Sequence, residues 1–403
     1  MKVLLSAYAC APGHGSEPEV GLQVLDAALG EHEVWVLTQP HMVERLRPWL
    51  AVHPAGDRAH LVPVDPPAPD RQDGLGALVR TQVSHERWQR AAAVVARDLH
   101  ARVGFDLVHH ATLAAYWMRT AVADLGLPLV WGPVGGAVEP PLGLIPELGV
   151  RGAAEDAVRA AVRLAFWRRP VVRRAARAAD VVLVQNSATR RRLSAHRSDV
   201  RILPNALCAT VAAMPQGTRR NDVAVVGRVV AWKAVTLAVR TLAALPDRTV
   251  VLRVYGEAGP EQARRVERLA GRLGVEGRVD LVGKLPRDEL LQQVATSGLL
   301  LHPSLHDEAS FTVAEALAVG TPVVALDHGG PPHVAAQWPG AATRLVRPST
   351  PRRTAHRLAG AVTSLLDPAR PLPTTTRAAS TDFGSAVLDS YAAALSLAAA
   401  RRA

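Results

Sequence analysis

Short runs of apolar residues alternate along the chain with longer segments in which apolar residues recur every three or four positions. The short runs are typical of buried strands, and the longer segments of helices that cover them. In the first half, strands are expected at residues 3–6, 34–38, 60–64, 107–109, 129–131, 181–184 and 201–203. In the second half, they are expected at residues 223–226, 249–254, 279–282, 299–302, 322–325 and 343–346. This alternation predicts two α/β domains with parallel sheets.

A segment with little periodicity separates the two predicted domains. Residues 204–220 contain two prolines and a glycine, which favours a linker. We therefore place a first domain at residues 1–204 and a second at residues 205–375. Residues 66–76, rich in Pro, Asp and Gly, are expected to form a surface loop.

Candidate chemistry follows the strand expected at residues 299–302. The loop after it would open at a carboxyl edge of the sheet, where parallel α/β sheets bind ligands. Backbone N–H groups of Ser310 and Phe311, at the start of the next helix, would suit an anionic phosphate. Asp307 and Glu315 lie eight positions apart, so both carboxylates could hold sugar hydroxyls in one cleft. Taken alone, Glu315 could equally lie on a solvated helix face and Asp307 could be a helix cap.

Two cations follow the strand expected at residues 223–226. Arg228 and Lys233 would lie at a strand-to-helix crossing, where they could neutralise a diphosphate leaving group. The chain has three lysines, Lys2, Lys233 and Lys284, against 47 − 3 = 44 arginines. A lysine at this place is notable, since an ammonium and a guanidinium bind phosphate differently. The alternative is that both are ordinary surface cations.

Together these segments resemble a known family. Gly-Arg, four residues and Lys at 227–233, then Asp307, seven residues, Glu315 and Ala-Leu-Ala-x-Gly-x-Pro-Val-Val at 316–324, look like the family-four retaining glycosyltransferases of GT-B architecture. Segments of the first half that are similar to the family, in the expected order, are 6–21, 105–112, 131–136, 180–189 and 203–206. The resemblance implies a GT-B fold, in which two Rossmann-like, doubly wound parallel-sheet domains face a central cleft. It also implies that a last helix, near 383–400, packs back on the first domain.

The resemblance assigns roles in the second domain by position. Arg228 and Lys233 would bind the donor diphosphate, and Glu315 would bind the nucleotide ribose. Asp307 would contact hydroxyls of the transferred sugar. The family usually has Glu at that position, and Glu308 beside it leaves the register open by one residue. Two glycines of the family's phosphate loop are replaced in this chain.

The first domain is expected to hold the acceptor. Gly15 and Ser16, before an expected helix, could approach a phosphate or sugar closely. His109 and His110 end a strand and point to opposite faces, so at most one enters the cleft, and we prefer His109. The catalytic residues implied by the resemblance are His109, Arg228, Lys233 and Asp307. The acceptor-side residues would be His110, Gly135 and Gly136.

Composition bears on the cellular compartment and on the binding partners of the surface. Only Cys10 and Cys208 occur, which favours a reducing cytoplasm over a disulfide scaffold, and no run of 18 apolar residues is present. The net charge is +11, with arginines concentrated in residues 151–201. We favour a solvated helix face there over contact with an anionic membrane, and nucleic acid is disfavoured because aromatic residues are only 4% of the chain.

The resulting hypothesis is a cytoplasmic retaining hexosyltransferase. It would move a sugar from a nucleoside-diphosphate donor, UDP-linked, to a small hydroxylated acceptor such as an aminocyclitol of antibiotic biosynthesis or another secondary metabolite. No cofactor is expected, and His302, His306 and Asp307, although close in sequence, give no consistent metal-ligand geometry. The alternatives are a glycosyltransferase of cell-envelope or lipid-linked glycans and a sugar-nucleotide epimerase of the same fold.

Overall fold

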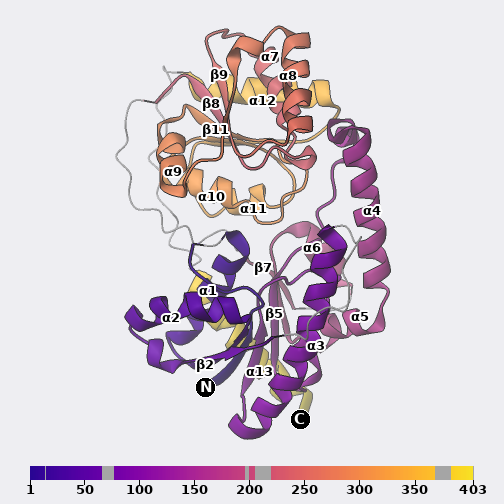
Figure 1. The fold of residues 1–403 in the computed structure, drawn as a ribbon, viewed down its shortest axis with the longest axis vertical. Helices are drawn as coiled ribbons and strands as arrows, with labels where there is room; N and C mark the ends of the chain where they lie inside the picture. Colours follow the sequence, from indigo (N-terminus) through magenta and orange to yellow (C-terminus); the bar gives the residue numbers. More distant parts are fainter. Residues whose placement is uncertain (14, 66–76, 196–198, 205–218, 368–382, 403) are drawn as a thin grey trace. The chain divides into compact units, whose positions relative to one another are not determined.

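The computed structural model describes residues 1–13, 15–65, 77–195, 199–204, 219–367 and 383–402. The chain forms two compact units, each built around a parallel sheet (Figure 1). The first unit comprises Met1–Ala137, Ala161–Cys208 and Thr381–Ala403, and the second comprises Val138–Ala160 and Ala209–Ser380. Every strand expected from the sequence is present, with its ends within three residues of the expected positions.

Among its described residues, the first unit has a sheet of seven strands in the order β3-β2-β1-β4-β5-β6-β7. These are β1 (Lys2–Ser6), β2 (Glu33–Thr38), β3 (Ala59–Pro63), β4 (Leu107–His110), β5 (Leu129–Val134), β6 (Val181–Val184) and β7 (Val200–Ile202). All neighbouring pairs are parallel. Strand β6 is buried along its whole length, as expected for a parallel strand covered on both faces.

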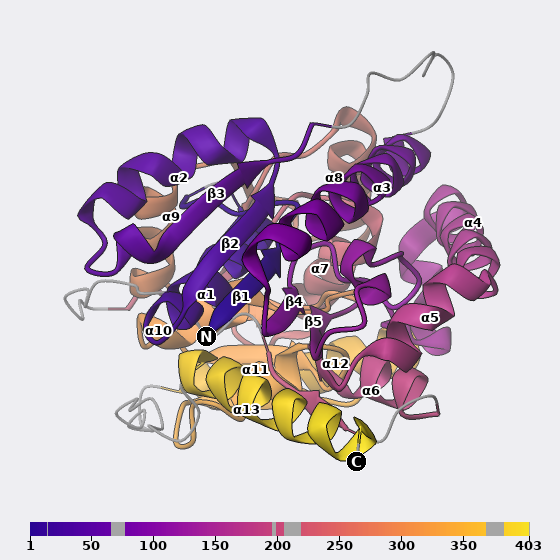
Figure 2. The same ribbon diagram turned by 90° about the horizontal axis from the view of Figure 1, so that it is seen from below.

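Helices cover both faces of this sheet. They are α1 (Ser16–Leu29), α2 (Pro40–Val52), α3 (Ala77–Val103), α5 (Pro170–Ala178), α6 (Ser187–Ser194) and α13 (Phe383–Arg402). Figure 2 shows α3 on one side of the strands and α13 on the other. Successive residues of β4 point to opposite faces, because Val108 joins the core cluster that contains Trp88 of α3, whereas His109 contacts Tyr391 of α13.

Helix α13 is long and rich in apolar residues. It is the one described helix that could cross a membrane by length and composition, and 33% of its most apolar stretch is buried. It packs on α1, β5 and β6 of the first unit. Its buried residues, spaced along one side of the helix, are Phe383, Val387, Ser390, Tyr391, Ala394 and Ala398. A packed domain helix passes the same composition test, so the test does not identify a membrane span.

The second unit has a described sheet of six parallel strands in the order β10-β9-β8-β11-β12-β13. These are β8 (Asp222–Val226), β9 (Val251–Tyr255), β10 (Val279–Gly283), β11 (Leu299–His302), β12 (Val323–Leu326) and β13 (Thr343–Val346). Its helices are α7 (Val235–Ala244), α8 (Pro260–Leu273), α9 (Arg287–Thr296), α10 (Phe311–Ala318), α11 (Pro331–Ala335) and α12 (Pro351–Leu366). Short turns of 3₁₀ helix are η3 (Leu142–Leu148) and η4 (Ala231–Lys233).

Residues 138–160 correct the expected domain boundary, because they belong to the second unit although the sequence places them within 1–204. Glu147 of η3 is 2% exposed, and it accepts hydrogen bonds from Thr236 Oγ1 at 2.5 Å and Arg240 Nε at 2.8 Å. Arg265 of α8 donates to the carbonyls of Glu147 and Leu148. A buried carboxylate needs such donors, so it fixes this segment to α7.

Helix α4 (Gly149–Trp167) continues from that segment, and the boundary between the units falls inside it, after Ala160. The expected linker at 204–220 lies largely outside the described residues, as does the expected loop at 66–76.

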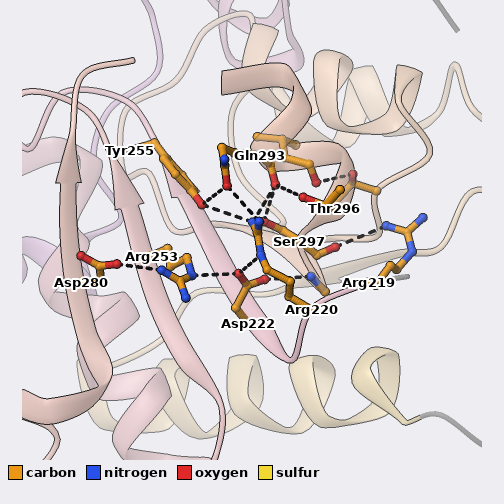
Figure 3. Close-up of polar contacts among 12 residues, drawn as sticks. Arg219, Arg220, Asp222, Arg253, Tyr255, Asp280, Gln293, Thr296 and Ser297 are labelled. Carbon is orange, nitrogen blue, oxygen red and sulfur yellow. Dashed lines mark hydrogen bonds and ion pairs between the residues drawn. The ribbon is translucent and has the colours of Figure 1, made fainter. Parts of the chain in front are cut away.

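A buried polar network holds the start of the second unit (Figure 3). Asp222, at the beginning of β8, is 3% exposed at its side chain and pairs with Arg220 at 2.7 Å and Arg253 at 3.1 Å. Its other oxygen accepts the Gly298 N–H at 2.9 Å. Arg220 also donates to the Gln293 side chain at 2.9 Å. One carboxylate therefore joins β8, β9 and the turn before β11.

We expect Asp222→Ala to lower the free energy of unfolding by about 2 to 4 kcal/mol, because it leaves two guanidinium groups without their shared buried partner. The matched control is Asp280→Ala, since Asp280 also pairs with Arg253, at 2.8 Å, but its side chain is 47% exposed. That control should cost less than about 1 kcal/mol. Chemical denaturation of both variants checks the difference, and equal losses would contradict it.

Candidate functional site

The candidate donor site lies at the carboxyl ends of β8 and β11 in the second unit. Gly227 follows β8 with φ of 130°, a backbone conformation that favours glycine. The chain then turns through η4 into α7, with Ala234 in the left-handed region at φ 48°. A Cβ atom at Gly227 would lie 3.5 Å from Cε of Lys233, so the lysine side chain passes directly over the glycine. The strand-to-helix crossing expected from the sequence thus directs Lys233 back across the strand end.

Three donors converge on the carboxylate of Asp307. Lys233 Nζ lies 2.9 Å and His302 Nε2 lies 2.8 Å from Oδ2. The backbone N–H of Ser310 donates to Oδ1 at 2.7 Å. Burial alone would raise the pKa of Asp307, but the positive charge of Lys233, followed by His302, holds it well below the usual value. The carboxylate is therefore charged and accepts three hydrogen bonds from the second unit.

The loop before α10 differs from the expected phosphate cradle. Ser310 lies in the left-handed region at φ 55° and is the N-cap residue of α10. Its N–H, expected to face a phosphate, donates instead to Asp307. Its hydroxyl oxygen is buried and has no hydrogen-bond partner among the residues that the structure describes. Phe311 begins the helix and is half-buried.

The two other acidic residues expected in the site, Glu315 and Glu308, each have a partner within the second unit. Glu315, on α10, is 19% exposed at its side chain and pairs with Arg287 of α9 at 2.9 Å. Burial raises the pKa of Glu315, and the guanidinium of Arg287 opposes that rise. Glu308 accepts the backbone N–H of Val138 at 2.9 Å, so its side chain holds the first residue of the segment 138–160.

Arg228 is exposed and forms no ion pair within the part of the chain that the structure describes. It follows Gly227, the residue over which the Lys233 side chain passes. Its guanidinium is accordingly available to an anionic ligand at the end of β8.

The first unit corrects the expectation for His109. This side chain is fully buried, with Nδ1 2.9 Å from the Tyr391 hydroxyl and Nε2 2.8 Å from the Gly132 carbonyl. The ring therefore donates a hydrogen bond from Nε2 to the Gly132 carbonyl and accepts one at Nδ1 from the Tyr391 hydroxyl. Burial lowers the pKa of His109 to about 4, against the effect of the Gly132 carbonyl. Both ring nitrogens are occupied, so His109 ties β4 to α13 and does not enter an open site.

The other expected residues of the first unit divide into exposed and packed positions. His110 is 1% exposed and lies 3.2 Å from the Ser6 hydroxyl, and burial, then the nearby His85 and His109, hold its pKa well below the usual value. Gly15 and Ser16 are exposed at the start of α1.

The two glycines expected on the acceptor side permit close packing. A Cβ at Gly135 would lie 2.7 Å from Oε1 of Gln185, and one at Gly136 would lie 2.8 Å from Nε1 of Trp117. Gly135 also donates its N–H to the Ala114 carbonyl at 2.8 Å. Gly136 is therefore required by its φ of 96° and by the Trp117 ring, whereas a side chain at Gly135 would require the end of the Gln185 side chain to move.

Two residues of the donor site were not assigned from the sequence. His302 was considered with His306 only as a metal ligand, although its place at the end of β11 puts it beside the loop that carries Asp307. Arg287 begins α9, and no spacing relates it to Glu315. A rule that any polar residue at the end of a buried strand faces the site would have found His302.

Comparisons with known proteins show similarity to one enzyme family and one fold. Residues 213–372 match the family described as Glycosyl transferases group 1. The whole chain aligns with the crystal structure of Anabaena HepE in complex with UDP and glucose, with a TM-score of 0.56 and 17% identity over 100% of this chain and 95% of that one. The fold is GT-B, with two parallel-sheet α/β domains. Residues 213–372, within the second unit, are thus similar to the group 1 glycosyltransferases.

Curated relatives match over shorter stretches. D-inositol 3-phosphate glycosyltransferase of Mycolicibacterium gilvum is 34% identical over 131 residues, which are 32% of this chain and 29% of that protein. The 2-deoxystreptamine glucosyltransferase of Streptomyces kanamyceticus is 36% identical over 107 residues, 26% of this chain and 27% of that protein. The chain thus matches less than a third of the length of either relative.

The buried histidine makes the first unit sensitive to acid. The pKa of His109 is about 4 in the folded state and about 6.5 in the unfolded state, so the unfolded chain binds a proton first as the pH falls. The stability that the neutral, buried ring contributes is therefore complete above pH 6.5 and is lost as the pH falls toward 4. That loss amounts to about 3 kcal/mol for this residue. His109→Gln should be less stable at neutral pH and should show a shallower fall in unfolding free energy between these pH values. Denaturant titrations across the range measure the slope, with His41→Gln, at an exposed ring, as the control. An unchanged slope in His109→Gln would contradict the assignment.

Proposed function

We propose that this chain transfers a hexosyl group, with retention of anomeric configuration, from a nucleoside-diphosphate sugar to a hydroxylated acceptor. The proposal rests chiefly on one observation, the fixed position of Lys233 over Gly227 at the end of β8. Departure of a nucleoside diphosphate places growing negative charge on its phosphates. Preorganised cations that meet this charge lower the barrier most effectively.

Lys233 and Arg228 supply those cations. One N–H of the Lys233 ammonium is directed to Asp307, which leaves two for phosphate oxygens. Arg228 can offer its planar guanidinium to the same diphosphate. With both cations in place, leaving-group stabilisation requires no metal ion, and we propose none. Glu315 is then the residue for the ribose hydroxyls, and binding would require it to exchange its contact with Arg287.

For the donor and acceptor, the names of similar proteins support a specific proposal. HepE was crystallised with UDP and glucose, and we propose a UDP-linked donor here. The two curated relatives carry inositol phosphate and 2-deoxystreptamine in their names, and both compounds are cyclitols. We propose a small cyclitol as the acceptor and a cytoplasmic site of action. An epimerase of the same fold would instead convert the donor without any acceptor.

Lys233→Ala tests the central role. We expect transfer from a UDP-sugar to an inositol or aminocyclitol acceptor to lose about 2 to 4 kcal/mol of transition-state stabilisation in kcat/KM. Lys284→Ala is the matched control, since it removes an exposed lysine of the same unit. Product analysis by mass spectrometry, with and without acceptor, gives the reaction and its rate. A folded Lys233→Ala variant with the rate of the control would refute the role.

Asp307→Asn separates two roles for this carboxylate. If it only read the transferred sugar, as the family resemblance implies, the variant would bind free UDP normally. Because Asp307 holds both Lys233 and the Ser310 N–H, we expect it to weaken UDP and the intact donor alike, by about tenfold or about 1.4 kcal/mol. Calorimetric titration of both ligands decides between the roles, and a defect confined to the intact donor would favour sugar reading.

A further inference from the structure

An apolar stripe faces solvent along α4. In the second unit it consists of Val150, Ala154, Ala157 and Val158, all exposed and spaced so that they lie on one side of the helix. Val150 is 92% exposed and Val158 is 61% exposed. An ordinary surface helix has the reverse arrangement, with polar residues outward.

The opposite side of the helix, which carries Gly152 and Arg159, faces the second unit. Gly152 packs on Ala231, to which a Cβ at this glycine would come within 2.7 Å. The guanidinium of Arg159 lies 4.6 Å from the centre of the Trp232 ring. These contacts fix the rotation of α4 about its own axis, so the outward direction of the stripe is set by packing within the second unit.

A basic pocket adjoins the amino end of the stripe. Its lining contains Val150 together with four arginines and one glutamate, namely Arg151, Arg265, Arg268, Arg272 and Glu261. Arg151 is paired with Glu261 at 2.7 Å, and Arg265 is held by the η3 carbonyls. Arg268 and Arg272 lie four residues apart on α8, are exposed, and form no ion pair among the described residues. Their charge is therefore uncompensated beside an exposed apolar surface.

We propose that this surface, the α4 stripe with the α8 arginines, docks on an anionic lipid bilayer. An apolar helix face enters the interfacial region of a bilayer, while nearby arginines bind anionic headgroups. A second copy of the chain fits less well. The stripe, from Val150 to Val158, is about 13 Å long and about 10 Å wide, so pairing two copies would bury about 260 Å². Stable interfaces bury roughly 1,200 Å² or more.

This assignment relocates the membrane contact considered for residues 151–201. In the first unit, Arg169 pairs with Glu86 at 2.7 Å and Arg174 pairs with Asp124 at 3.2 Å. Those arginines are partly neutralised by their own unit. The pair on α8 lies outside the segment that the sequence singled out, and it lines the same pocket as the exposed Val150.

Sedimentation with vesicles tests the proposal on the full chain. Two parts phosphatidylcholine to one part phosphatidylglycerol should bind the protein, in a salt-sensitive manner, and phosphatidylcholine alone should bind it much less. The double variant Arg268→Glu, Arg272→Glu should lower partitioning by about tenfold or more. Val150→Asp with Val158→Asp should lower it similarly, because it charges the apolar stripe.

Matched controls lie on α2 of the first unit. Arg45→Glu with Arg47→Glu makes the same change in net charge at exposed arginines, and Val52→Asp changes a valine that is 82% exposed. Both should bind vesicles as the unchanged protein does, and thermal unfolding confirms that every variant is folded. Absence of binding to the anionic vesicles, or equal loss in the control variants, would overturn the proposal. Sedimentation velocity gives the oligomeric state. A dimer of the unchanged protein that dissociates in the Val158→Asp variant would also overturn the proposal, in favour of self-association.

Discussion

The candidate site of the second unit depends on the compensation of one buried carboxylate. Asp307 is charged in a place where charge is costly, and the cost is offset only because donors arrive from three separate parts of the fold. Lys233 comes from η4, His302 from the end of β11, and the Ser310 N–H from the loop itself. The loop conformation and the position of Lys233 consequently depend on each other, because both are held by Asp307. A change at any of the three donors alters what the other two can do.

The sequence predicted the fold well because strand formation here is a local property. Parallel strands buried on both faces are continuous apolar runs, as in β6, and such runs are visible without any knowledge of the partner strands. The boundary between the units was not predictable in the same way. Residues 138–160 follow shortly after β5, and contacts with residues far along the chain, such as those of Glu147 with Thr236 and Arg240 about 90 residues further on, assign them to the second unit.

The candidate site was predictable in its members more than in their roles. The family resemblance implied that Asp307 and Lys233 share a site, and the structure places Lys233 Nζ 2.9 Å from Asp307 Oδ2. The resemblance could not show that Asp307 would accept hydrogen bonds from three protein donors, because one of them depends on the turn at Ser310. His109 illustrates the same limit, since alternation places it on a face of the sheet but does not say that Tyr391 will cover that face.

The bond between His109 and Tyr391 joins residues 282 positions apart and has a consequence for the order of events during synthesis. The last helix, α13, is part of the first unit, so the interior of that unit stays incomplete until residues 383–402 have left the ribosome. Most of the second unit, residues 209–380, is synthesised before that point and can close its own sheet first. Contacts of such long sequence separation form slowly. The half of the molecule made first is therefore the half finished last, and its uncovered β4 and β5 are the surfaces that a chaperone would have to shield in the interval.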